Sequence, residues 1–183
     1  MSYSLEDFCS DTRGILKEQD DHEGRERVRQ HFERLLKDEA FCAQYLGEES
    51  TPGVRQIHED PEQGFCVLVY HMPKPRVSPP HDHGGSWAIY GQVSGYTDMT
   101  VWAEAEPGSG RVEPVRQFRL GAGEAGLFDT REIHSIDHPA DAKFVRVTGV
   151  DMAGERRRVF DPEAGTVKEV ESVGTGAAGR AAT

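Results

Sequence analysis

Apolar side chains along this chain follow two different periods, which divide it into a helical part and a β-rich part. Over residues 4–46 they recur every three or four positions, the spacing that gathers side chains on one face of a helix. Ser4 and Asp7 form a capping-box pattern at the start, and a polar break falls at residues 19–22. The positions that carry the period are Leu5, Phe8, Ile15 and Leu16, then Val28, Phe32, Leu35 and Leu36. We therefore expect a helical segment over residues 1–46.

From Gly47 to about Phe160 the pattern changes to short runs rich in β-branched and aromatic residues, separated by Gly, Pro and Asp. Short strands at regular spacing with turn residues between them are typical of an all-β sandwich or barrel. The best predicted strands cover residues 65–72, 87–93, 97–102, 112–120, 124–128 and 143–150. The predicted organisation is a helical segment over 1–46 that packs on a barrel over 47–165, followed by a flexible tail over 166–183.

Charge and cysteine content narrow the class of protein. The chain has 183 residues, and 32 acidic against 21 basic side chains give it a net charge of −11. No basic stripe interrupts this acidity, so nucleic acid and anionic membranes are not the expected partners. The three cysteines Cys9, Cys42 and Cys66 are odd in number and show no paired metal spacing. We expect reduced thiols and a cytoplasmic location.

Residues 79–95 carry the candidate chemistry. His81 and His83 are one residue apart, and in an extended segment side chains at this spacing lie on the same face. Pro79 and Pro80 before them disfavour a helix, and a Gly-Gly turn follows. The two histidines can therefore bind one metal ion from one extended segment. This arrangement resembles the first half of a metal-binding cupin, which implies a double-stranded β-helix, or jelly-roll barrel.

His134 is the expected third ligand. It follows the glycine turn at residues 121–123 and a short strand, in the outline of the second half of a cupin. His138 stands before Pro139 in a polar stretch, so we expect it in a solvent-exposed loop. Three neutral imidazoles suit Fe(II), which needs open positions for a substrate and O₂, while Zn, Ni, Mn and Cu also bind imidazole.

Within the cupins, the chain resembles the cysteine dioxygenase-like, or thiol dioxygenase, family, in a bacterial branch. Many cupins have a fourth, glutamate ligand where this chain has Ala88, and its absence is typical of thiol dioxygenases. Arg55 stands where that family has the arginine that binds the substrate carboxylate, and this role is implied by the resemblance alone. The chain departs from the family at Phe144, Arg146 and Thr148, which replace a Ser, His, Tyr set.

Strand periodicity suggests which other residues face the metal. If Ala88 faces it, then Tyr90 faces the same way. Tyr90 is either a core aromatic residue or a participant in the chemistry. Arg146 shares a face with Phe144 and Thr148, and it is either an edge residue in water or a clamp for a substrate anion.

The leading hypothesis is a mononuclear non-haem Fe(II) dioxygenase that oxidises a small thiol or related acid with O₂ to a sulfinate. Alternatives are a dioxygenase that cleaves C–C bonds in a diketone or hydroxyketone, a non-oxidative metal-dependent lyase or isomerase, and a non-enzymatic small-molecule-binding cupin. The expected partners are a small-molecule substrate and O₂, and a homodimer is a candidate assembly.

Overall fold

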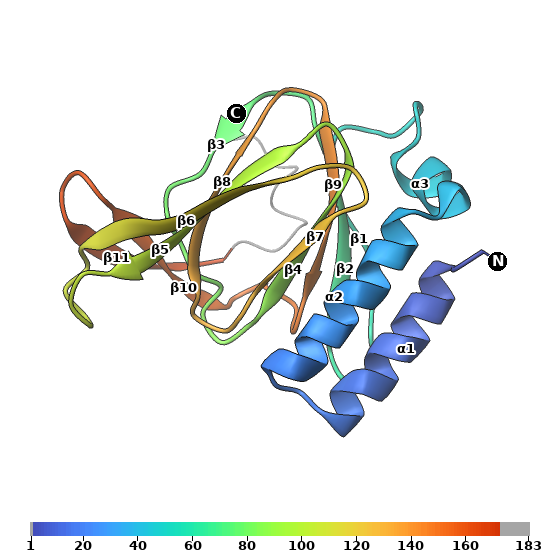
Figure 1. Cartoon of the computed structure of the whole chain (residues 1–183), viewed down its shortest axis with the longest axis horizontal. Coiled ribbons are helices and arrows are strands. Elements are labelled where there is room, and N and C mark those ends of the chain that lie inside the picture. The colour runs from blue at the N-terminus through green and yellow to red at the C-terminus, as the bar shows by residue number, and fades with distance from the viewer. Residues whose placement is uncertain (1, 173–183) are drawn as a thin grey trace.

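The computed structural model describes residues 2–172, which form two facing antiparallel sheets with three helices on the outside (Figure 1). The five-stranded sheet has the order β1 (Gly53–Glu59), β2 (Cys66–Met72), β9 (Ala142–Thr148), β4 (Ala88–Ser94) and β7 (Ala125–Phe128). The four-stranded sheet has the order β3 (Arg76–Val77), β8 (Ile133–His138), β5 (Thr97–Glu104) and β6 (Val112–Leu120). A separate hairpin joins β10 (Arg156–Asp161) to β11 (Thr166–Glu171). The predicted double-stranded β-helix preceded by helices is confirmed.

Side-chain caps begin each of the helices α1 (Leu5–Glu18), α2 (His22–Leu36) and α3 (Glu39–Leu46). Ser4 and Asp7 form the predicted capping box on α1, while Asp21 and Asp38 accept backbone N–H bonds at the starts of α2 and α3. These caps satisfy amide groups that have no partner within the first turn of a helix. The predicted break between the first two helices falls where Gln19 ends α1 and Asp21 caps α2. No helix in the described part of the chain is both long and apolar enough to span a membrane.

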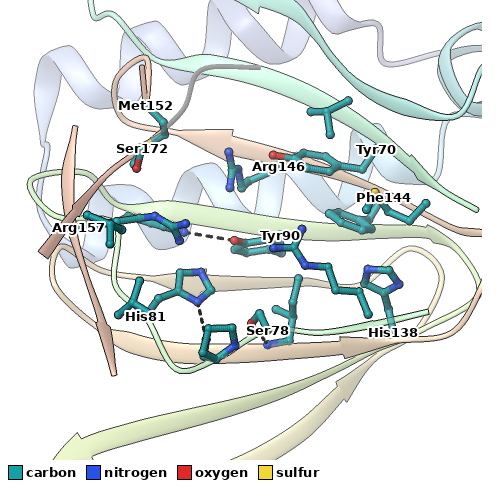
Figure 2. A pocket seen from close by; sticks show the side chains of 18 residues that line it. Tyr70, Ser78, His81, Tyr90, His138, Phe144, Arg146, Met152, Arg157 and Ser172 are labelled. Atoms are coloured by element: carbon teal, nitrogen blue, oxygen red, sulfur yellow. Dashed lines mark hydrogen bonds between the residues drawn. The ribbon is translucent and has the colours of Figure 1, made fainter. Parts of the chain in front are cut away.

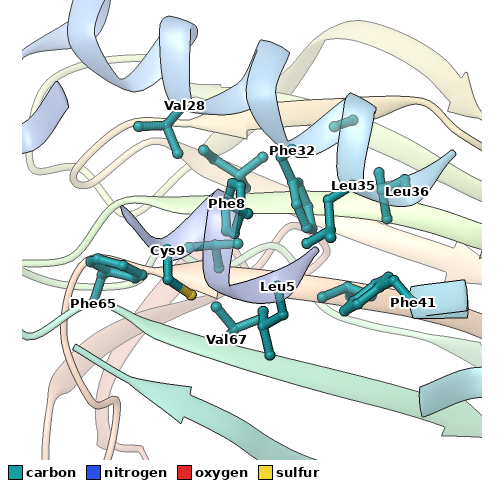
Figure 3. Close-up of a cluster of buried hydrophobic side chains, with 14 of the residues drawn as sticks. Leu5, Phe8, Cys9, Val28, Phe32, Leu35, Leu36, Phe41, Phe65 and Val67 are labelled. Carbon is teal, nitrogen blue, oxygen red and sulfur yellow. The ribbon is translucent and has the colours of Figure 1, made fainter. Parts of the chain in front are cut away.

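The helices cover the outer face of the five-stranded sheet (Figure 1). Figure 3 shows the cluster between them, in which Phe8 and Phe32 from α1 and α2 pack above Val67 of β2. On β9, Val145 and Val147 belong to this cluster, whereas Phe144 belongs to the cluster inside the barrel. The predicted division of this strand into two faces is therefore confirmed, and it leaves Arg146 on the inner face.

Several strands were not predicted from the sequence, because they are short or rich in polar residues. These are β1, β3, β8, β10 and β11. Residues 166–171 of the expected tail form β11, which pairs along its length with β10. Residues 173–183 of that tail lie outside the described residues. His138 belongs to β8 and is 1% exposed, so its prediction as a solvent-exposed loop residue was wrong.

Candidate metal centre and cavity

Backbone pairing brings the two predicted halves of the histidine site together. His81 and His134 exchange two backbone hydrogen bonds, each 2.9 Å from N to O. His81 is an isolated bridge residue rather than part of a regular strand, and the chain turns at Gly84, where φ is 62°. His81, His83 and His134 offer ligand atoms that all lie within 4.8 Å of one another, and all three residues are buried. This group could hold one metal ion.

Backbone carbonyls orient two of the three rings, with His81 Nδ1 facing Pro79 and His134 Nδ1 lying 3.4 Å from the carbonyl oxygen of Glu132. His81 Nδ1 lies 2.9 Å from the carbonyl oxygen of Pro79, so Nδ1 carries the proton and Nε2 keeps its lone pair. His134 Nε2 is buried and has no hydrogen-bond partner. A histidine that binds a metal typically donates from its other ring nitrogen to a carbonyl or carboxylate. The orientation of His81 and the unpaired nitrogen of His134 both fit a bound metal.

Burial keeps the three imidazoles neutral. It lowers the pKa of His81 to about 4, and it lowers the pKa values of His83 and His134 well below 6.5. A neutral imidazole is the form that binds metals. Three neutral nitrogen donors without a carboxylate suit Fe(II), Zn, Ni and Cu, and the identity of the metal is not fixed by the ligand set.

Asp82 fixes the segment that carries His81 and His83. Its carboxylate is fully buried and accepts from Arg158 Nε at 2.7 Å and from the backbone N–H of Arg158 at 2.8 Å. It also accepts from the backbone N–H of Gly84 at 3.1 Å, and therefore holds both the turn and the hairpin strand β10. Asp82 was not predicted from the sequence, although an acidic residue between two candidate ligands was the available signal.

A cavity of about 420 Å³ opens beside the three histidines (Figure 2). Its apolar walls come from both sheets and from the β10–β11 hairpin. Arg76, Arg146 and Arg157 line it, and no Asp or Glu stands among its lining residues in the described part of the chain. In a protein of net charge −11, this is a local cationic site. Such a site attracts a small anion despite the overall charge.

Arg146 lies on β9, an inner strand of its sheet, between Leu68 of β2 and Tyr90 of β4. It is therefore not an edge residue in water. Its Nε is buried without a partner, and its guanidinium carbon lies 5.3 Å from the ring centre of Tyr70 and 5.9 Å from that of Tyr90. No carboxylate among residues 2–172 forms an ion pair with it. The guanidinium is placed to bind an anion that enters the cavity.

Tyr90 connects the aromatic wall to the histidines. Its hydroxyl lies 3.2 Å from His83 Nε2, and its ring lies edge-on to that of His134, with centroids 5.6 Å apart. The prediction that Tyr90 faces the site agrees with this geometry. A hydroxyl at this position can exchange a proton with a ligand in the cavity.

The structure places Arg55 away from these residues. Arg55 lies on the edge strand β1, is exposed, and donates from its guanidinium to the carbonyl oxygen of Tyr45 at 2.9 Å. It does not line the cavity. The carboxylate-binding role implied by the family resemblance is therefore corrected, because the side chain points out of the barrel toward α3.

Comparison with solved structures finds matches at low sequence identity and with TM-scores near 0.4. KdgF from Halomonas sp. is 15% identical with a TM-score of 0.41, over 55% of this chain and 83% of that one. The DMSP lyase DddQ from Ruegeria pomeroyi DSS-3 is 16% identical with a TM-score of 0.39, over 52% of this chain and 45% of that one. The Schizosaccharomyces pombe Cnp3 cupin domain is 15% identical with a TM-score of 0.40, over 61% of this chain and 62% of that one. No family model matches the chain, and no curated protein matches it in sequence.

Proposed function

We propose that His81, His83 and His134 bind one Fe(II) ion, and that the protein is a dioxygenase that converts a small thiol acid to a sulfinate. The observation that carries this proposal is the meeting of three neutral imidazoles, without a carboxylate ligand, in a cavity with an unpaired arginine. Iron(II), when bound, supplies the redox chemistry that allows O₂ to react with a thiol. The conversion of a thiol and O₂ to a sulfinic acid balances without a further reductant.

The side chains of the cavity would bind and orient the substrate. Arg146 holds the carboxylate, because its guanidinium is buried on the inner face and can form two parallel hydrogen bonds. Tyr90 is the candidate proton donor or acceptor, since its hydroxyl lies 3.2 Å from His83 Nε2. The apolar wall reduces competition from water and strengthens the arginine–carboxylate contact.

Metal analysis tests the ligand assignment. His81→Ala, His83→Ala and His134→Ala should each lose most of the bound iron, because a two-ligand site binds weakly. The matched control is His138→Ala, which removes a buried histidine of the same cavity and should keep the metal. Full metal content in His134→Ala would refute the third ligand. Metal should also raise the melting temperature of the wild-type protein and not that of the ligand variants.

Oxygen uptake tests the reaction. Iron-loaded protein should consume O₂ with small thiol acids and form the sulfinate at one molecule of product per O₂. Uptake with diketones and not with thiols would instead support C–C cleavage, and metal binding without any turnover would support a binding protein.

A non-oxidative lyase or isomerase is a second candidate, favoured by the tyrosine hydroxyl beside His83. In that reaction the metal would act as a Lewis acid and Tyr90 would transfer the proton. Turnover in the absence of O₂, retained with Zn and lost in Tyr90→Phe, would support this candidate over the dioxygenase.

A further inference from the structure

His138 is a buried histidine in the cavity that the proposed chemistry does not use. It is 1% exposed, and its Nδ1 lies 2.9 Å from the carbonyl oxygen of Pro139. A carbonyl can only accept, so Nδ1 carries the proton and Nε2 is an acceptor. This Nε2 is buried without a hydrogen-bond partner. An unsatisfied buried acceptor costs free energy, so Nε2 is placed to accept from water in the cavity or from a donor group of a bound ligand.

The strand β8 places His138 far from the metal centre. His134 and His138 are four residues apart on this strand, and by its period of two they face the same side, with Ile136 between them. At the rise of a β-strand their Cα atoms are about 13 Å apart. Ile136 and His138 line the cavity together with His81 and His83, so it extends along β8 from the metal centre to His138 (Figure 2).

The wall between these two ends is apolar and aromatic. Tyr70 and Phe144 stack on one another with ring centroids 4.5 Å apart and an angle of 12°. Phe144 also faces His138, with centroids 5.8 Å apart. Ile136 and Met72 complete the same wall. The cavity thus has Arg146 and Arg157 beside the metal centre, an aromatic wall, and His138 Nε2 at the remote end, where Arg76 of β3 pairs with His138.

We propose that His138 Nε2 accepts a hydrogen bond from a hydroxyl or amino group at the remote end of an elongated acid. This inference rests on the proposed function in that the acidic end of the substrate lies beside Arg146 and the three histidines. A three-carbon thiol acid is too short to bridge the metal centre and His138, whose strand places it about 13 Å from His134 between Cα atoms. The substrate class is therefore a thiol acid with an apolar, ring-sized middle and a terminal donor, not a compact amino acid.

Binding of two matched probes tests the proposal without turnover. The probes are 3-(4-hydroxyphenyl)propanoate and 3-phenylpropanoate, which differ only in the terminal hydroxyl, titrated calorimetrically into the full chain. The hydroxylated probe should bind roughly threefold to tenfold more tightly, the ratio expected of one hydrogen bond. His138→Phe keeps a ring of similar size and should abolish this preference, while affinity for 3-phenylpropanoate stays within about twofold.

Equal affinities in the wild type, no binding of either probe, or a preference that survives in His138→Phe would each overturn the proposal. If His138→Phe folds poorly, the ¹⁵N resonance of His138 Nε2 in the wild type provides the second readout. It should shift with the hydroxylated probe only. Titrations of metal-free and zinc-loaded protein separate the two proposals. If only the metal proposal is wrong, the protein still binds the hydroxylated probe more tightly than 3-phenylpropanoate. If only the His138 proposal is wrong, the two probes bind equally and metal binding is unchanged.

Discussion

The two faces of the five-stranded sheet are built from the same strands but have different chemistry. On β9, Val145 and Val147 point to the helices and are fully buried among hydrophobic side chains. Phe144 and Arg146 point into the barrel, where Arg146 Nε has no partner. The outer face is a packed hydrophobic interface, and the inner face keeps polar groups that packing alone does not satisfy.

The inner face therefore offers unpaired polar groups to a ligand. Four buried nitrogens without partners belong to residues in or beside the cavity: His134 Nε2, His138 Nε2, Arg146 Nε and Arg157 Nε. Each costs stability unless water or a ligand pairs with it. The outer face should therefore govern folding, and the inner face should govern binding. Substitutions on the two faces should therefore have separable effects on stability and on binding.

The largest expected effect is on the outer face. Phe32 is fully buried between α2 and the sheet, and its ring lies 5.4 Å from that of Phe8. Phe32→Ala should lower the free energy of unfolding by about 3–5 kcal/mol, because it leaves a cavity in a packed cluster. Urea denaturation measures this loss. Metal bound per folded molecule should stay unchanged, and a fall in metal content under native conditions would contradict the separation of the two faces.

The second-largest expected effect comes from a substitution on the inner face, and it should lower catalytic activity without lowering the free energy of unfolding. Arg146→Met keeps most of the side-chain volume and removes the charge. On an acidic substrate, kcat/KM should fall roughly 30- to 1000-fold, which corresponds to about 2–4 kcal/mol for a lost carboxylate contact. The free energy of unfolding should be unchanged or higher, since a buried unpaired charge has been removed.

Arg55→Ala is the matched control for Arg146→Met, because Arg55 lies on the same sheet and points outward. Its kcat/KM should stay close to wild type. Normal turnover in Arg146→Met together with impairment in Arg55→Ala would restore the role that the family resemblance implied. Normal turnover in both variants would indicate an uncharged substrate.

The sequence could predict the features that depend on local periodicity. The three- and four-residue spacing of apolar side chains around Phe8 and around Phe32 indicated the buried face of each helix. Alternation along β9 placed Arg146 on the face of the sheet opposite to that of Val145 and Val147. The grouping of His81, His83 and His134 came from the motif outline and is now matched by ligand atoms within 4.8 Å.

The features that the sequence could not predict depend on pairing between distant segments. Arg55 matches the sequence position of the substrate-binding arginine in the family pattern. On an edge strand, however, that sequence position does not determine whether the side chain points into the barrel or away from it. The stretch around His138 is polar and reads as a loop, yet it pairs with β5 and β3 as an inner-facing strand. Asp82 is fixed by Arg158, and this contact joins residues 76 positions apart in the chain.

The third expected effect is on metal affinity, and it concerns the contact between the segment that carries His81 and His83 and the β10–β11 hairpin. Asp82→Asn keeps the size of the side chain but weakens the ion pair with Arg158, which is 2.7 Å long. Metal affinity should fall about 10- to 100-fold, the usual cost of losing a residue that orients ligands. Competition with a chelating dye measures it. Asp98→Asn is the control, because the exposed Asp98–Arg119 pair lies outside the cavity and should leave metal affinity unchanged.

The smallest effect returns to the outer face, at Gly91 on β4. A methyl group there would overlap with Leu36 and Phe32 of α2, so Gly91→Ala should cost about 1 kcal/mol of unfolding free energy as a mild overpacking. In the Phe32→Ala background the methyl no longer meets the Phe32 ring, so the cost should fall to what the remaining contact with Leu36 imposes. Gly14 on α1 has open space around its Cα, so Gly14→Ala should instead stabilise the protein by up to about 1 kcal/mol. Equal costs of Gly91→Ala in both backgrounds would mean that the substitution acts through the strand backbone, and not through the helix–sheet packing that defines this face.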